Sequence, residues 1–206
     1  MSTSTGHDSP PQPDDVALMR LIADDDEEAF RLLVERHQHL VCGTITKMLG
    51  DPIEAEDLAQ QVFLRVYKAA KSYQPSAQFK TWLFTIVRNL VLNEYRRRTR
   101  AWLQPLPNQD DDESSSYGAE LPDKAAKSPD QQALEKEMMR AIDRAILALP
   151  EQQRLAVILR RYDEFSYEEI AAVLKTTVPS TKSLLFRARE SLREALQRYL
   201  GEGEGK

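Results

Sequence analysis

"SYEEIAAVLKTTVPSTKSLLFRARESL", residues 166–192, has the pattern of two short helices around a turn. Ser166 and Glu169 form an S-x-x-E capping box, which starts a helix because each side chain satisfies a backbone amide at the other residue. Apolar residues at helical spacing follow. The turn KTT then leads to Val178–Pro179, and proline fits the first turn of a second helix. The segment therefore predicts a helix-turn-helix.

The second helix of this pair is basic and amphipathic. At 100° per residue its apolar face forms around Leu185 and comprises Thr181, Leu185, Ala188, Leu192 and Leu196. Polar and basic residues cover the remaining surface: Ser180, Lys182, Ser183, Arg187, Arg189 and Arg193. Such a layout suits a recognition helix, whose first turns face base edges while long cations reach phosphates. An ordinary amphipathic helix with a solvated basic side has the same pattern, so both interpretations stay open.

The remainder of the chain also has helical character. Its 206 residues include only 7 glycines, and no stretch alternates in the manner of a strand. Leu, Ala, Glu, Arg and Gln dominate the periodic segments, which favours an all-α protein. The single cysteine, Cys42, excludes an internal disulfide and fits a reducing compartment.

Two helical blocks are separated by a polar segment. The first spans 14–98, with breaks at the acidic turn ADDDEEA and at GDP. Residues 99–130 are rich in Pro, Asp, Ser and Gln and lack periodicity, which predicts a flexible acidic linker. The second block spans 131–200. Residues 1–13 are expected to form a disordered tail, and residues 201–206 a second tail. We expect two small helical domains on a tether that leaves their spacing undefined.

Charge is distributed unevenly along the chain. The net charge is -5, from 33 acidic and 28 basic residues. Residues 58–100 nevertheless hold 9 basic residues against 1 acidic, and residues 174–206 hold 7 against 4. The screening length at physiological salt is about 8 Å, so a distant acidic face hardly weakens a local basic surface. The overall acidity is therefore compatible with nucleic-acid binding.

The first of these basic segments also contains aromatic residues. Tyr73, Phe79 and Trp82 precede a helix that ends in the cations of EYRRRTR. Aromatic side chains beside cations are suited to stacking on unpaired bases while following the backbone. A structural alternative stays open, in which Phe79 and Trp82 are core residues that anchor the start of the helix.

In order along the chain, four stretches resemble the extracytoplasmic-function (ECF) class of bacterial RNA polymerase sigma factors. They are EAEDLAQQVFLRVYKA (54–69), FKTWLFTIVRNLVLNEYRRR (79–98), LPEQQRLAVILRRYDEFSYEEIAAVL (149–174) and TKSLLFRARESLREAL (181–196). The resemblance extends from about residue 15 to about residue 198. It implies a sigma region 2 domain at 14–98 and a sigma region 4 domain, with the helix-turn-helix, at 131–200.

The resemblance further implies a non-catalytic specificity subunit that binds core polymerase, recognises two promoter elements and helps to melt the DNA. Core contacts would be to the clamp helices of the largest subunit and the flap of the second-largest subunit. Promoter DNA and an anti-sigma protein are the other implied partners, and no cofactor is expected. The absence of an apolar leader or a membrane-length apolar run leads us to expect a cytoplasmic protein.

Site residues carried over from the family fall into three groups. Core-polymerase docking is implied for Asp57, Leu58, Gln60, Gln61, Phe63 and Arg65. Minus-ten DNA contacts are implied for Gln74, Ser76, Gln78, Phe79, Lys80, Trp82, Arg88, Asn89, Asn93, Arg96 and Arg97. Minus-thirty-five DNA contacts are implied for Ser180, Thr181, Lys182, Ser183, Phe186, Arg187 and Arg189.

Three positions depart from the family pattern. Lys175–Thr176 replaces a turn that often contains glycine, Leu184 stands where Arg is common, and Phe186 stands where His is common. The latter two changes remove polar contacts, so the minus-thirty-five sequence read by this chain is expected to differ. The linker run Asp110–Glu113 suggests a mimic of RNA phosphate in the polymerase exit path, with a merely solubilising linker as the alternative.

Other functional classes explain fewer features of the sequence. A transcription regulator would use only the helix-turn-helix, but it would not need the 57–65 docking face or the aromatic-basic run. A module that binds polymerase without DNA would leave both basic surfaces unexplained. His37, His39 and Cys42 suggest a metal site, but residues two apart lie on different helix faces and no second cysteine accompanies them, so no metal is expected. No nucleophile–base set or phosphate-binding glycine loop indicates an enzyme.

Overall fold

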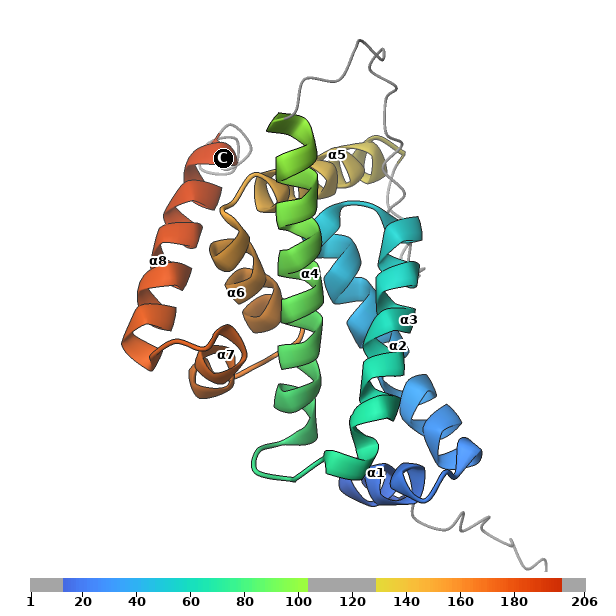
Figure 1. Cartoon of the computed structure of the whole chain (residues 1–206). Helices are drawn as coiled ribbons and strands as arrows, with labels where there is room; N and C mark the ends of the chain where they lie inside the picture. The colour runs from blue at the N-terminus through green and yellow to red at the C-terminus, as the bar shows by residue number, and fades with distance from the viewer. Residues whose placement is uncertain (1–12, 104–128, 198–206) are drawn as a thin grey trace, which may run out of the picture.

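The structure is a computed structural model that describes residues 13–103 and 129–197. Its described part is all α-helical, apart from one 3-10 turn, η1 (Ala70–Ser72). The N-terminal helices are α1 (Asp15–Ala23), α2 (Glu27–Leu49), α3 (Pro52–Ala69) and α4 (Phe79–Leu103). The C-terminal helices are α5 (Pro129–Leu147), α6 (Glu151–Arg161), α7 (Tyr167–Leu174) and α8 (Val178–Ala195) (Figure 1). The predicted all-α fold with a helix-turn-helix is confirmed, and the exact domain boundaries stay predictions.

Short polar side chains start the N-terminal helices where the sequence breaks. The carboxylates of Asp14 and Asp26 accept hydrogen bonds from Ala17 N and Ala29 N at 2.7 and 3.0 Å, so the ADDDEEA turn separates α1 from α2. Gly50 then ends α2 with a φ of 77°, a left-handed conformation that glycine adopts without strain. Each of these local signals acts within four residues, which explains why the sequence predicts them.

The helix-turn-helix forms as predicted. The Ser166 side chain accepts from Glu169 N at 3.1 Å, and Ser166 N donates to the Glu169 carboxylate at 2.7 Å, completing the capping box. Lys175 ends α7 with a φ of 55°, in the left-handed region. The Thr177 hydroxyl accepts from Ser180 N at 3.3 Å and starts α8. Lys175 therefore adopts a left-handed conformation, which costs a residue with a Cβ atom more than it would cost glycine.

The two helical blocks pack directly against each other. Helix α4 lies between the α2–α3 pair and the C-terminal helices (Figure 1), in contact with α7 and α6, while α2 contacts α5 and α6. A single hydrophobic cluster includes Val87 from the first block and Leu159 from the second. We expected a tether to leave the domain spacing undefined. In the structure the two blocks are instead in direct contact. The reason is that the first block leaves apolar faces of α2 and α4 uncovered, and α5–α7 pack on them.

Candidate nucleic-acid and polymerase-binding surfaces

Helix α8 presents most of its predicted recognition residues to solvent. Lys182, Ser183, Phe186 and Arg187 together line an open depression on the surface. Phe186 is 65% exposed, which is unusual for a phenylalanine because exposure forfeits the stabilisation that burial would give. Arg189 is also exposed, whereas Ser180 is half-buried. One apolar ring among cations and a hydroxyl can contact both the apolar and the polar groups of a base edge.

The inner face of α8 holds the helix in place. Thr181 is fully buried and Leu184 is 9% exposed. Of the seven predicted minus-thirty-five residues, Thr181 therefore faces the core and its contribution would be to packing. Leu184 likewise packs inward, so its difference from the Arg of relatives changes the domain core rather than the exposed surface. The orientation follows from Leu185 and Ala188, which fix the same helical face against α6 and α7.

The loop before α4 carries exposed amides above an aromatic cluster. Gln74, Ser76 and Gln78 are exposed, whereas Phe79 is 5% exposed. Tyr73 packs on Trp82 with ring centroids 4.8 Å apart, and Phe79 lies 5.6 Å from Trp82. This geometry favours the structural alternative for Phe79. Trp82 is half-buried and keeps part of its surface outside the core.

The cations of α4 differ in their surroundings. Arg88 donates to Asn89 Oδ1 at 3.1 Å, and both side chains are half-buried. Asn93 and Arg96 are exposed. Lys80, in contrast, donates through Nζ to the backbone carbonyl of Asp163 at 2.5 Å. On α4, Asn93 and Arg96 are therefore accessible, whereas Lys80 and Arg88 are engaged in contacts within the chain.

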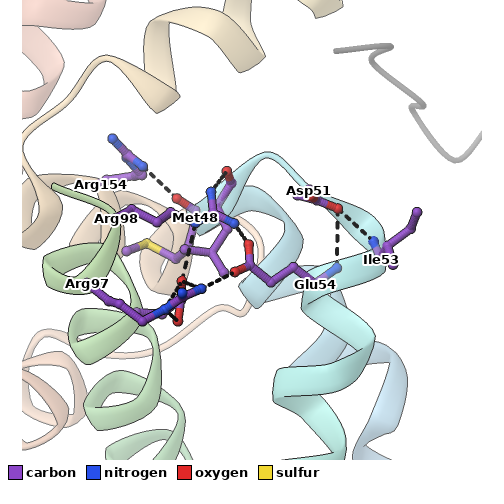
Figure 2. A network of polar contacts seen from close by, with 9 residues as sticks. Met48, Asp51, Ile53, Glu54, Arg97, Arg98 and Arg154 are labelled. Carbon is purple, nitrogen blue, oxygen red and sulfur yellow. Dashed lines mark hydrogen bonds and ion pairs between the residues drawn. The ribbon is translucent and has the colours of Figure 1, made fainter. Parts of the chain in front are cut away.

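An ion-pair network holds the C-terminal part of α4 against α3 (Figure 2). Arg97 pairs with Glu94 at 2.7 Å, and Arg98 pairs with Glu54 of α3. Arg98 also donates to Leu49 O at 3.2 Å, at the end of α2, where helix carbonyls lack partners within the helix. The side chain of Arg97 remains 72% exposed, so pairing with Glu94 leaves its guanidinium accessible.

Helix α3 presents a mixed stripe of apolar and polar residues. Asp57, Gln60, Gln61 and Arg65 are exposed, whereas Leu58 and Phe63 are 5% and 6% exposed and belong to the core. Three exposed apolar residues extend the stripe and were missed from sequence: Ile53 (79%), Leu64 (51%) and Tyr67 (37%). Their spacing from Asp57 and Gln60, close to multiples of a helical turn, is the signal that could have identified them.

His37 and Cys42 of α2 lie in unrelated environments. His37 is buried, with Nε2 3.1 Å from Asp15 Oδ2, and its ring packs on Phe79. Cys42 is half-buried, and burial together with the nearby Glu56 raises the pKa of its thiol. Within 13–103 and 129–197, no three His, Cys, Asp or Glu side chains gather where they could hold a metal ion. No helix in these ranges is long and apolar enough to cross a membrane. The acidic run Asp110–Glu113 lies outside the described residues.

Comparison with known proteins matches both blocks to one family. The sigma-70 region 2 family matches residues 33–101, and the sigma-70 region 4 family matches residues 139–192. The chain is 33% identical to the RNA polymerase sigma-H factor of Pseudomonas aeruginosa over 93% of this chain and 98% of that protein. It is 32% identical to the ECF RNA polymerase sigma-E factor of Escherichia coli over 89% of this chain and 94% of that protein.

Two solved structures share the fold. CnrH, in complex with the cytosolic domain of CnrY, has a TM-score of 0.64 at 23% identity and covers 89% of this chain and 97% of its own. The sigma factor RpoE of Bartonella quintana, in complex with the anti-sigma factor NepR, has a TM-score of 0.62 at 24% identity, over 82% and 98%. Sequence identity above 30% over nearly the whole chain, with both regions in order, establishes that the chain belongs to the ECF class of bacterial RNA polymerase sigma factors.

Proposed function

We propose that this chain is a non-catalytic specificity subunit that binds core RNA polymerase in the cytoplasm and directs initiation at promoters with two recognition elements. The observation that carries the proposal is the open depression on α8, where Lys182, Ser183, Phe186 and Arg187 project from the second helix of a helix-turn-helix. A helix presented in this way fits the major groove of duplex DNA.

The chemistry of these side chains indicates how α8 would read the minus-thirty-five element. Arg187 can donate two hydrogen bonds to guanine O6 and N7, and Phe186 can contact the methyl group of thymine. Lys182 and Arg189, on the shoulder, would contact phosphates and fix the register. An apolar contact at Phe186 would give this chain a preference for thymine at one position of its element.

The loop 74–78 and the accessible side chains of α4 would act on the minus-ten element. The exposed amides of Gln74 and Gln78 can hydrogen-bond the edge of an extruded base, and Trp82 can stack on it. Asn93 and Arg96 would contact the strand beside it. Extruding a base costs a few kcal/mol, which these contacts must recover.

The stripe on α3 would dock on the clamp helices of the polymerase largest subunit. Exposed Ile53, Leu64 and Tyr67 supply apolar contact area, while Asp57 and Gln60 supply polar contacts on the same face. Interfaces commonly combine a few apolar anchors with polar contacts in this way. Region 4 would sit on the flap of the second-largest subunit, which would hold α8 at the minus-thirty-five element.

An anti-sigma protein is a further proposed partner. Bartonella quintana RpoE, which shares this fold, was solved bound to an anti-sigma factor. Such a protein would regulate the chain by covering the exposed stripe of α3, since docking on polymerase and docking on the anti-sigma protein would then exclude each other.

Run-off transcription with bacterial core polymerase over a library of promoter fragments tests the proposed function. Discrete starts should appear only when the chain is present. They should weaken for Asp57→Ala with Leu64→Ala in α3, whereas the matched change Glu168→Ala in α7, also exposed, should leave them unchanged. Sequence-selective binding of duplex DNA by the chain alone, with no start at any fragment, would instead identify a helix-turn-helix regulator.

A further inference from the structure

We propose that helix α1 is part of the minus-ten reader, because it fixes loop 74–78 through a chain of contacts that runs from Asp15 over His37 to Phe79. Asp15 and His37 are positioning residues, which act through Phe79 rather than by touching DNA. The match to sigma-70 region 2 begins at residue 33 and leaves α1 outside. The identity of the ligand rests on the proposed function, whereas the support of the loop by α1 does not.

Helix α1 is held firmly beside the start of the loop. Its apolar residues Leu18, Met19 and Ile22 are at most 1% exposed. The helix has only 9 residues and would be marginal alone, so this packing sets its position. It contacts α2 and η1, at the end of the molecule where the chain turns from α3 into α4 (Figure 1). Lys71 of η1 also donates to Asp25 at 3.1 Å, but this pair is exposed and adds little.

The first link in the chain of contacts is the carboxylate of Asp15, at the start of α1. Its Oδ1 accepts from Arg36 of α2 at 2.7 Å, and its Oδ2 lies 3.1 Å from His37 Nε2. Arg36 donates to Pro13 O at 2.9 Å as well. Burial raises the pKa of Asp15, but the contacts with His37 and Arg36 outweigh it and hold this pKa below its ordinary value. The carboxyl is therefore ionised at neutral pH and attracts the Nε2 edge of the imidazole.

The second link is the ring of His37, which passes its position to the aromatic cluster below the loop. This ring is 7% exposed and lies 5.2 Å from the ring of Phe79, the residue that directly follows the loop. Phe79 in turn lies 6.0 Å from Tyr73, the residue that directly precedes the loop. Side chains in a protein interior are close-packed, so a displaced His37 ring would shift Phe79 and with it the end of the loop.

Tyr73 brings α1 close to the other end of the loop as well. Its hydroxyl is buried and makes no hydrogen bond within residues 13–103 and 129–197. Burial raises the pKa of this hydroxyl, and so do the nearby carboxylates of Asp15 and Asp14. An unpaired buried hydroxyl contributes no stability, so packing of the ring must hold Tyr73 in place. Both residues that flank the loop therefore depend on the position of α1.

The loop itself depends on these two ends. All residues from 74 to 78 are exposed, so no side chain of the loop is anchored in the core. Holding a loop in its binding conformation reduces the entropy lost when a ligand binds. Hydrogen bonds from Gln74 and Gln78 to a base edge also require a defined direction, whereas contacts to phosphates tolerate displacement. Loss of support from α1 should therefore weaken discrimination between bases most.

Two substitutions interrupt the chain of contacts, and each has a matched control. His37→Ala removes the ring between α1 and Phe79, and His39→Ala is its control, because His39 is exposed on the same helix. Asp15→Asn removes the charge with little change of shape, and Asp24→Asn makes the same change at an exposed position at the end of α1.

The first measurement needs no DNA. In a Trp102→Phe chain the one remaining tryptophan is Trp82, which lies 5.6 Å from Phe79. Quenching of its fluorescence by acrylamide reports how tightly the cluster below the loop is packed. We expect quenching to increase for His37→Ala and Asp15→Asn, and to keep the wild-type value for both controls.

The second measurement uses the complex of the full chain with core polymerase. Single-stranded oligonucleotides carry each of the four bases in turn at every position of the minus-ten element found by run-off transcription. For His37→Ala, the ratio of affinities for the preferred and the other bases should fall about fivefold at the most selective position, as for the loss of one hydrogen bond. Asp15→Asn should lower this ratio less. Both variants should bind the minus-thirty-five duplex with wild-type affinity, which a general loss of folding would not allow.

An Asp15→Asn chain with wild-type quenching and a wild-type ratio would overturn the role of α1, even if His37→Ala proved unstable. Increased quenching without a change in base discrimination would restrict α1 to stability and would also overturn the proposal. Absence of transcription starts for the wild type would refute the proposed function. Increased quenching for His37→Ala and Asp15→Asn would in that case still show that α1 supports the loop.

Discussion

Helices α8 and α4 both combine cations with aromatic residues, yet the structure treats them differently. On α8 the ring of Phe186 and the side chains around it face solvent. On the N-terminal half of α4, Phe84 is fully buried and Lys80 is engaged, because α7 packs across that half. Similar composition thus yields one open surface and one covered surface. The neighbouring elements decide which, since a helix exposes only the faces that its neighbours leave free.

The largest expected effect contrasts the two aromatic residues. Phe84→Ala should destabilise the chain by about 3–5 kcal/mol, because it leaves a cavity beside Phe165 in the shared core. Phe186→Ala, at an exposed position, should change stability by no more than about 0.5 kcal/mol. Urea unfolding followed by circular dichroism measures both. Equal destabilisation by the two changes would contradict the contrast between a covered and an open surface.

The second prediction concerns the cations. Arg187→Ala should weaken binding of the selected minus-thirty-five duplex by about 1–3 kcal/mol and relax specificity at one base pair, because Arg187 projects from the open depression. Arg193→Ala is the control, since Arg193 lies later on the same helix and pairs with Glu190 at 2.8 Å. Fluorescence anisotropy on site variants measures affinity and specificity. If Arg187→Ala weakened the binding of all DNA sequences equally, Arg187 would contact a phosphate rather than a base.

The third prediction is a pH dependence of domain closure. Burial raises the pKa of Asp163 to about 6 in the docked form, so the docked form binds the proton more tightly than a separated form with an ordinary carboxyl. Closure is therefore favoured at low pH and weakens as the pH rises through about 6. The docking constant should fall by up to about tenfold between about pH 5 and pH 7.

Energy transfer between fluorescent labels at Arg20→Cys on α1 and Ser191→Cys on α8, both exposed positions, in a Cys42→Ala chain measures this dependence. Asp163→Asn, which cannot ionise, should abolish it. The charged groups that face Asp163 and oppose the rise of its pKa are Lys47 of α2 and Lys80 of α4. If energy transfer in the Asp163→Asn chain changed with pH as it does in the wild type, another titrating group would be responsible.

The smallest expected effect lies in the capping box. Ser166→Ala removes the side-chain acceptor of Glu169 N and should cost about 1 kcal/mol, seen as a lower Tm. Ser166→Gly should lower the stability by only a few tenths of a kcal/mol, because glycine is itself a tolerated N-cap. Since α7 also packs on α4, loss of the cap should lower energy transfer in the labelled chain as well. A lower Tm without a change in energy transfer would separate the stability of α7 from domain docking.

The sequence by itself determined the helices, their caps and the order of the two regions. The capping box of Ser166 and Glu169, the glycine stop at Gly50 and the basic face of α8 all arise from residues a few positions apart, so periodicity and turn chemistry identify them. Asp57 and Gln61, which the family resemblance singled out, both lie on the exposed face of α3. Periodicity did not single out Ile53 or Leu64, because apolar residues are first assigned to a core.

Only the tertiary structure decided which residues of the two regions contact each other. Thr44 and Asp163 are separated by 119 positions, and neither residue type signals that the two will meet. The burial of Phe79 and Thr181 likewise depends on which neighbours cover each helix face. Local interactions are encoded at fixed short spacing, whereas docking depends on apolar faces left over after each region has folded. Whether the two regions stay apart on a tether or dock against each other is therefore decided only by their tertiary contacts.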